Sequence, residues 1–103
     1  SVIIRWSEQR PDLAGRIGGE EFLLVLPETE MEGAMFLAER IRTALAAAPQ
    51  VIGDLAIPVT CSLGVAERIG IDREAGMLLA RADGALYQAK SMGRNQVQAA
   101  GKP

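Results

Sequence analysis

The sequence predicts an α+β fold in which helices pack on a mixed β-sheet. Residues 21–26 and 57–66 are rich in apolar residues and have the pattern of buried strands. Residues 30–48 and 72–90 repeat apolar residues every three or four positions, as amphipathic helices do. The chain has 103 residues, of which 49% are hydrophobic. That is enough for one modest core, so we expect a single domain over 1–103.

The first element is ambiguous. Residues 2–6 have strand propensity, whereas Val2, Trp6 and Gln9 also share one stripe of a helix. The local sequence does not decide between the two.

A pair of glycines marks the next feature. Residues 13–17 are typical of a short strand, and the apolar strand 21–26 follows. Gly18 and Gly19 supply the positive φ that a two-residue hairpin loop demands. We therefore expect the turn between the two strands at these glycines.

The expected helix ends rest on capping residues. Thr29 and Glu32 have the spacing of a capping box, in which each residue satisfies a free backbone N–H of the other, so a helix is expected to begin there. Asp72 is the expected N-cap of the second helix, and Gly93 ends it. A short final strand is expected over residues 95–98.

The segment between the helices contains a turn and a strand. Gly53-Asp54 signals the turn. Gly64 lies inside the strand 57–66, which indicates a bulge or the close approach of another backbone.

Composition excludes several classes of function. A net charge of -2, a pI of about 5.1 and few aromatic residues leave no basic stripe, so no nucleic acid partner is expected. The absence of histidine removes Ser-His and Cys-His catalysis and imidazole metal sites within this chain. Cys61 is expected to be a buried thiol in a reducing compartment. No apolar run reaches the roughly 18 residues of a membrane span, so we expect no membrane contact and a cytoplasmic location.

Two carboxylates and two cations are the candidate functional groups. Glu20 and Glu21 could bind Mg2+ (or Mn2+), since one or two carboxylates and substrate phosphates suffice, although a solvated hairpin tip is commoner. Successive strand residues point to opposite faces, so the two glutamates are not expected to converge. Lys90 and Arg94 could clamp a phosphate tail, or could simply complement the helix dipole. Together, an acidic turn and a cationic helix end are the two halves of a metal–nucleotide site.

Five motifs resemble, in order and spacing, the C-terminal part of GGDEF-domain diguanylate cyclases. They are RIGGEEF (16–22) with the Leu-Pro that follows, AERIR (38–42), TCSLGVA (60–66), ADGALYQAK (82–90) and GRN (93–95). The glutamate in place of aspartate in the signature is an accepted variant in that family. The resemblance implies a ferredoxin-like, nucleotidyl-cyclase-like mixed sheet with packed helices, which lacks the N-terminal strand and helix of the family.

The resemblance also implies an activity. Enzymes of this family are bacterial signalling proteins that condense two GTP molecules into cyclic di-GMP and release pyrophosphate at a homodimer interface, with Mg2+ at the phosphates. Glu20 would be a metal ligand, and Glu21 would assist it in catalysis. The remaining four residues would bind the nucleotide, two lying close to it and two holding its terminal phosphates, namely Gly18, Gly19, Lys90 and Arg94.

The departures from the family lie upstream. The first strand, a second metal-binding aspartate, the phosphate-holding loop and the guanine-reading residues have no counterpart in this sequence. By resemblance, residues 1–9 would be the end of a helix, and the missing strand would be central, next to the signature strand. Its loss would expose unpaired N–H and C=O groups, so we expect a swapped or edge-paired dimer, or aggregation.

A remnant of the family's inhibitory site for cyclic di-GMP is also present. That site is an R-x-x-D pattern shortly before the signature, and Asp12 matches its aspartate. Gln9 stands at the arginine position, however, and Arg10 is one residue late. Arg40 matches a second arginine of the site, although an exposed helical arginine is the commoner explanation.

Three hypotheses follow. The first is a partial GGDEF domain whose parent protein makes cyclic di-GMP, while this chain alone has little or no activity. The second is a degenerate domain that serves as a GTP-sensing or dimerisation module, against which the intact GGEEF argues. The third is a scaffold whose acidic turn has no function.

Overall fold

The computed structural model describes residues 1–11, 17–70 and 74–101. Its elements in chain order are β1 (Val2–Pro11), β2 (Ile17–Leu26), α1 (Met31–Ala47), β3 (Gln50–Ile52), β4 (Leu55–Ile57), β5 (Thr60–Glu67), α2 (Ala75–Ser91) and β6 (Val97–Ala99). The predicted α+β class is confirmed, and both predicted helices are present.

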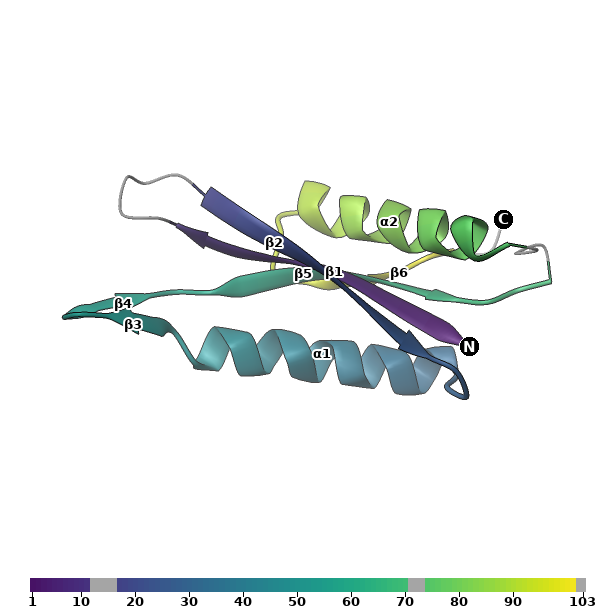
Figure 1. The fold of residues 1–103 in the computed structure, drawn as a ribbon, viewed down its shortest axis with the longest axis horizontal. Coiled ribbons are helices and arrows are strands. Elements are labelled where there is room, and N and C mark those ends of the chain that lie inside the picture. The colour runs from purple at the N-terminus through teal and green to yellow at the C-terminus, as the bar shows by residue number, and fades with distance from the viewer. Residues whose placement is uncertain (12–16, 71–73, 102–103) are drawn as a thin grey trace.

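One mixed sheet organises the molecule. Its strands run in the order β2, β1, β5, β6; β1 is antiparallel to both neighbours, and β6 is parallel to β5. α1 lies along one face of this sheet and α2 along the other (Figure 1). β5 is therefore covered on both sides, and its residues 61–66 are buried. β3 and β4 form a separate hairpin that projects from one end of the molecule (Figure 1).

The first element is a strand, so the helix implied by the family resemblance for residues 1–9 is wrong. Val2 and Ile4 are buried on the α1 face, whereas Ile3 is buried against α2. Apolar side chains on both faces of a strand need cover from both sides, which the centre of this sheet provides. β1 pairs with β2 and with β5, so the expectation of an unpaired sheet centre is also wrong.

The expected hairpin loop at Gly18-Gly19 is wrong as well. Both glycines lie within β2, where Gly18 pairs with Arg10 and Gly19 pairs with Gln9. β1 is 10 residues long, and its last residue, Pro11, pairs with Ile17 of β2. The two strands therefore remain paired beyond both glycines. Of the short strand predicted over residues 13–17, Ile17 is the first residue of β2, and residues 13–16 lie outside the described residues.

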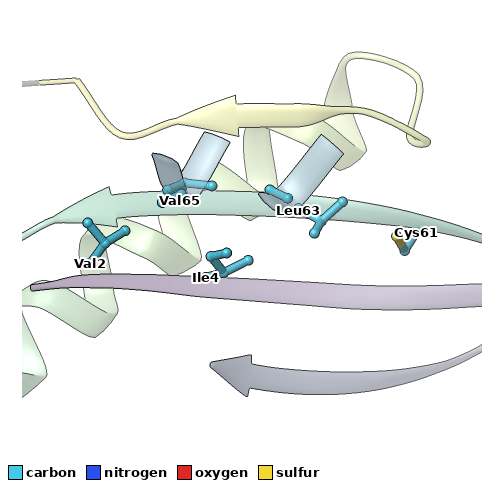
Figure 2. Packing of buried hydrophobic residues seen from close by; sticks show 7 residues of the cluster. Val2, Ile4, Cys61, Leu63 and Val65 are labelled. Carbon is cyan, nitrogen blue, oxygen red and sulfur yellow. The ribbon is translucent and has the colours of Figure 1, made fainter. Parts of the chain in front are cut away.

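The main hydrophobic core lies between the sheet and α1. Side chains of β1 and β5 point into it, namely Val2, Ile4, Cys61, Leu63 and Val65 (Figure 2). α1 contributes two fully buried alanines, Ala34 and Ala38. Cys61 is a buried free thiol, as the sequence predicts.

A glycine sets the distance between the sheet and α2. A Cβ atom added at Gly64 would lie 2.3 Å from the backbone nitrogen of Leu86 and 2.4 Å from the carbonyl oxygen of Ala82. Atoms at these separations overlap, so a residue with a side chain would push the helix away. The predicted close approach of another backbone at Gly64 is confirmed.

The capping box predicted for α1 is wrong. The helix begins at Met31, and the side chain of its N-cap residue, Glu30, makes no capping hydrogen bond. Instead, the backbone N–H of Met31 donates to Oε2 of Glu67 at 2.7 Å. The end of β5 thus brings a carboxylate to the helix start, in place of the local pair Thr29 and Glu32.

The remaining elements follow the sequence closely. α2 begins at Ala75, while its predicted N-cap, Asp72, lies outside the described residues. The predicted turn connects β3 to β4, and Gly53 within it has a φ of 61°. β6 overlaps the predicted final strand. In the part of the chain that the structure describes, neither helix is long and apolar enough to cross a membrane.

Candidate functional site

β2 directs its two glutamates to opposite faces of the sheet, as strand alternation predicts. Phe22 stacks on Trp6 with 5.2 Å between ring centroids, and Trp6 packs against the core beneath α1. Glu21 precedes Phe22 and so faces α2, whereas Glu20 faces the α1 side. Both glutamates are exposed.

Glu21 meets cations from two other elements. Nζ of Lys90, in the last turn of α2, lies 3.4 Å from Oε1 of Glu21. Arg5 of β1 donates from Nη2 to Oε2 of Glu21 at 3.1 Å. Lys90 and Glu21 are 69 residues apart in the sequence, so the fold joins a signature carboxylate to a cation of the helix end.

Arg5 also binds a second carboxylate. Its Nε donates to Oδ1 of Asp83 in α2 at 3.1 Å. The Arg5 side chain is 24% exposed, whereas the side chains of Glu21 and Asp83 are 49% and 51% exposed. These groups surround a pocket of about 250 Å³, which is lined by Arg5, Glu21, Asp83, Leu86, Tyr87 and Lys90. We call it the charged pocket.

The two cations predicted at the helix end are separated by its C-cap. Gly93 (φ 119°) and Arg94 (φ 62°) both have left-handed backbones. The N–H of Arg94 donates to the carbonyl oxygen of Ala89 at 2.9 Å, as in a Schellman motif. Arg94 is exposed and does not line the charged pocket, because the chain leaves the helix between Lys90 and Arg94.

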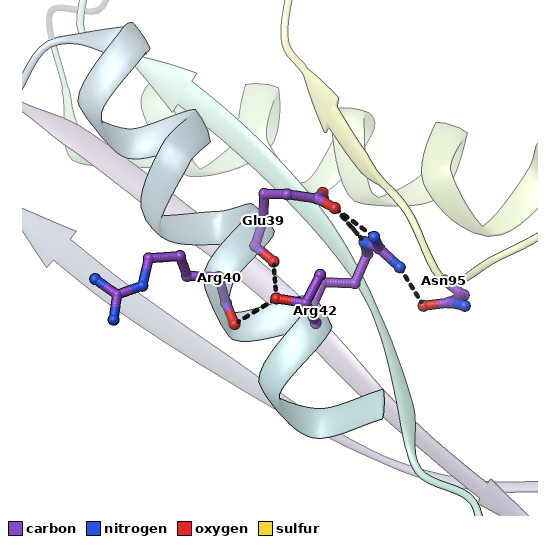
Figure 3. A network of polar contacts seen from close by, with 5 residues as sticks. Glu39, Arg40, Arg42 and Asn95 are labelled. Atoms are coloured by element: carbon purple, nitrogen blue, oxygen red, sulfur yellow. Dashed lines mark hydrogen bonds and ion pairs between the residues drawn. The ribbon is translucent and has the colours of Figure 1, made fainter. Parts of the chain in front are cut away.

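A polar network holds the segment that carries Arg94. Oδ1 of Asn95 accepts a hydrogen bond from Nη1 of Arg42 at 3.0 Å, and Arg42 also pairs with Glu39 (Figure 3). The hydrogen bond between Arg42 and Glu39 lowers the pKa of the glutamate and raises the pKa of the arginine. The N–H of Asn95 donates to the buried hydroxyl of Ser62 at 3.1 Å. The end of α2 is therefore tied to both α1 and β5.

Gln9 and Arg40, two positions of the expected inhibitory-site remnant, lie within the described part of the chain. Gln9, at the arginine position, is buried, and its Oε1 accepts a hydrogen bond from Ser62 at 3.3 Å. Arg40 is exposed on α1, and its side chain points away from Arg42 and Asn95 (Figure 3). Asp12 lies outside the described residues.

The donor set for a metal is small. Among the described residues, no three acidic or cysteine side chains come close enough together to hold a metal ion by themselves. Mg2+ in phosphate sites needs only one or two carboxylates, because phosphates and water supply the other oxygens. Glu20 and Glu21 are both exposed and face opposite sides of the sheet, so each can offer one carboxylate to such a metal on its own side.

Sequence reasoning missed Arg5 and Asp83. Asp83 lies two helical turns before Lys90, and this spacing places both side chains on one face of α2, so the helix period could have revealed it. Arg5 gave no such signal, because its contacts depend on the position of β1 between β2 and β5.

The fold and the GGEEF signature together point to one class of protein. Residues 2–96 match the family model described as "Diguanylate cyclase, GGDEF domain". The chain belongs to this family.

Individual relatives agree with this class. The chain is 41% identical over 93 residues to diguanylate cyclase DgcP of Pseudomonas aeruginosa, and 42% identical over 88 residues to the response regulator PleD of Caulobacter vibrioides. These matches cover 89% and 84% of the chain but only 14% and 19% of the two relatives. The chain therefore spans less than a fifth of either protein.

Solved structures share the fold. The GGDEF domain of DgcB from Caulobacter crescentus, solved in complex with c-di-GMP, matches with a TM-score of 0.78 at 23% identity, over 99% of this chain and 77% of that one. The active GGEEF domain of a diguanylate cyclase from Vibrio cholerae matches with a TM-score of 0.72 at 24% identity, over 100% and 85%.

Proposed function

We propose that residues 1–103 are the C-terminal part of a GGDEF domain whose parent protein condenses two GTP molecules into cyclic di-GMP and pyrophosphate. The observation that carries this proposal is the 3.4 Å contact between Glu21 of the GGEEF signature and Lys90 of α2. A site for a metal-bound triphosphate needs cations for the phosphates close to the carboxylate motif that holds the metal, and this contact brings a cation to the GGEEF signature. Family membership and the identity to DgcP support the same activity.

The role proposed for each residue follows from the charge of its side chain. Glu20 ligates the metal, and Glu21 supports it from the α2 side of the sheet. Lys90 binds the terminal phosphates at the charged pocket, and Arg94 reaches them from beyond the C-cap. Gly18 and Gly19 have no side chain, so a nucleotide can lie against the backbone of β2.

Mg2+ (or Mn2+), when bound, neutralises phosphate charge and polarises the phosphoryl group that is attacked. The reaction joins two nucleotides, whereas the charged pocket of about 250 Å³ has room for one phosphate tail. We therefore propose that two copies of the domain each bring one GTP to a shared interface. The cytoplasm, where GTP is made, is the compartment that this activity requires.

A binding experiment tests the proposal. Isothermal titration of the chain with GTP is carried out with Mg2+ and with a chelator, for the wild type, Glu20→Ala and Lys90→Met. We expect Mg2+-dependent binding that weakens at least about tenfold in both variants, because each removes a charged contact to the metal or the phosphates. Arg68→Met is the control, since Arg68 is exposed and does not line the charged pocket.

The outcomes separate the hypotheses. Absence of GTP binding by the wild type would leave only a scaffold. Binding without cyclic di-GMP formation is expected for the isolated chain, because the upstream residues of the family's site have no counterpart in its sequence. Turnover of GTP at a rate similar to a full GGDEF domain would refute this part of the proposal.

A further inference from the structure

We propose that Arg5 is a positioning residue of the charged pocket, which holds Glu21 in place when Lys90 passes from this glutamate to a phosphate. This inference rests on the proposed function and deepens it. It assigns a role to a residue of β1, the strand that pairs with the signature strand.

The geometry gives Arg5 two fixed anchors. Nη2 donates to Glu21 of β2 and Nε donates to Asp83 of α2, each at 3.1 Å. A planar guanidinium that bonds carboxylates through different nitrogens loses its freedom to rotate. With 24% of its side chain exposed, Arg5 is also the more enclosed of the two cations in the pocket, since Lys90 is 30% exposed.

The two oxygens of Glu21 have different partners. Oε2 accepts the hydrogen bond from Arg5 at 3.1 Å, whereas Oε1 has the longer 3.4 Å contact with Lys90. Lys90 has a flexible stem and ends in a single ammonium group, so it can turn from the carboxylate to a phosphate. Arg5 cannot turn to the phosphate in the same way, because its Nε is also bonded to Oδ1 of Asp83.

This difference has a consequence when a phosphate enters. The phosphate removes the ammonium of Lys90 from Glu21 and brings negative charge close to the carboxylate. Repulsion would drive an unsupported glutamate out of the pocket. The bond from Arg5 opposes this movement and keeps Oε1 directed into the charged pocket, on the side of the phosphate.

The inference is tested by titrating GTP in the presence of Mg2+ into the wild type, Arg5→Met, Glu21→Gln and the double variant. Arg5→Met keeps most of the aliphatic stem and removes both hydrogen bonds. We expect it to weaken binding about tenfold, as loss of a residue that supports a ligand side chain does. In the Glu21→Gln background the same change is expected to have less than about a twofold effect, because Arg5 acts through Glu21.

Two further variants separate positioning from simple structure or charge. Arg5→Lys retains the charge but replaces the planar fork, whose Nε and Nη2 reach the two carboxylates separately, by one flexible ammonium, so we expect it to bind as weakly as Arg5→Met. Arg68→Met removes an exposed arginine outside the pocket and is expected to bind like the wild type.

Each contrary result has a distinct meaning. If the wild type does not bind GTP, the proposed function fails and this inference falls with it. If Glu21→Gln weakens binding while Arg5→Met does not, only the inference is overturned. An equal loss from Arg5→Met with and without Glu21 would show that Arg5 acts independently of Glu21, and would also overturn it.

Discussion

Gly64 of β5 packs directly against the backbone of α2, so its substitution tests this packing. We expect Gly64→Ala to lower the free energy of unfolding by about 3 kcal/mol, near the upper end for overpacked cores, because the new Cβ would meet helix backbone that cannot move alone. Gly84→Ala is the matched control. Apart from neighbouring residues and the backbone of its own helix, nothing lies within 4 Å of a Cβ at Gly84. The alanine at this exposed helical position should therefore raise the free energy of unfolding by about 0.5–1 kcal/mol. Chemical denaturation measures both, and an equal effect of the two changes would contradict the packing.

The buried thiol of Cys61 makes the free energy of unfolding depend on pH in the alkaline range. Burial raises the pKa of its thiol from 9.0 to about 11. Between these values the unfolded chain loses the thiol proton while the folded chain keeps it, so the free energy of unfolding falls as pH rises. We expect a loss of about 2 kcal/mol from this group across that interval.

Denaturant titrations at several pH values between 9.0 and about 11 measure this loss. Cys61→Ala is less stable throughout, since it leaves a small cavity, but it should lack the thiol's share of the pH dependence. If the free energy of unfolding fell equally with pH in the wild type and in Cys61→Ala, the thiol would not be the cause of the pH dependence.

At the scale of elements, the start of α1 depends on β5. Replacing Glu67 by alanine removes the carboxylate that accepts from the N–H of Met31 at 2.7 Å, and we expect a loss of about 1 kcal/mol. Glu30→Ala should change stability by less than about 0.5 kcal/mol, because the Glu30 side chain makes no capping bond. Thermal unfolding followed by circular dichroism compares the two, and a larger effect at Glu30 would favour local capping.

β2 is the long edge of the sheet, and this exposure predicts self-association of the chain. Leu23 and Val25 on this strand are 47% and 55% exposed. We expect sedimentation velocity to show a concentration-dependent dimer that Val25→Lys weakens, since a charge on an edge strand opposes pairing. Phe36→Lys is the control, because Phe36 is 68% exposed but lies on α1. A monomer at all concentrations would contradict this prediction.

For the whole molecule, much of the fold could be predicted from periodicity. The helical repeats of α1 and α2 and the apolar pattern of β5 are local properties, and the structure confirms them. The N-terminal segment could not be assigned in this way, because its pattern suits both a strand and a helix. Its position between β2 and β5 decides the matter, since only a strand there pairs with both neighbours.

The candidate site, like the fold, could be predicted only in part from the sequence. The family, the chemistry of the carboxylates and cations, and the opposite orientation of Glu20 and Glu21 could all be predicted from the amino-acid sequence, because motif spacing and strand alternation are properties of the chain. The contact of Glu21 with Lys90, and the ion pairs of Arg5 with Glu21 and Asp83, became visible in the folded molecule alone. These contacts connect residues from separate elements, and the distances between such residues are set by sheet order and helix packing.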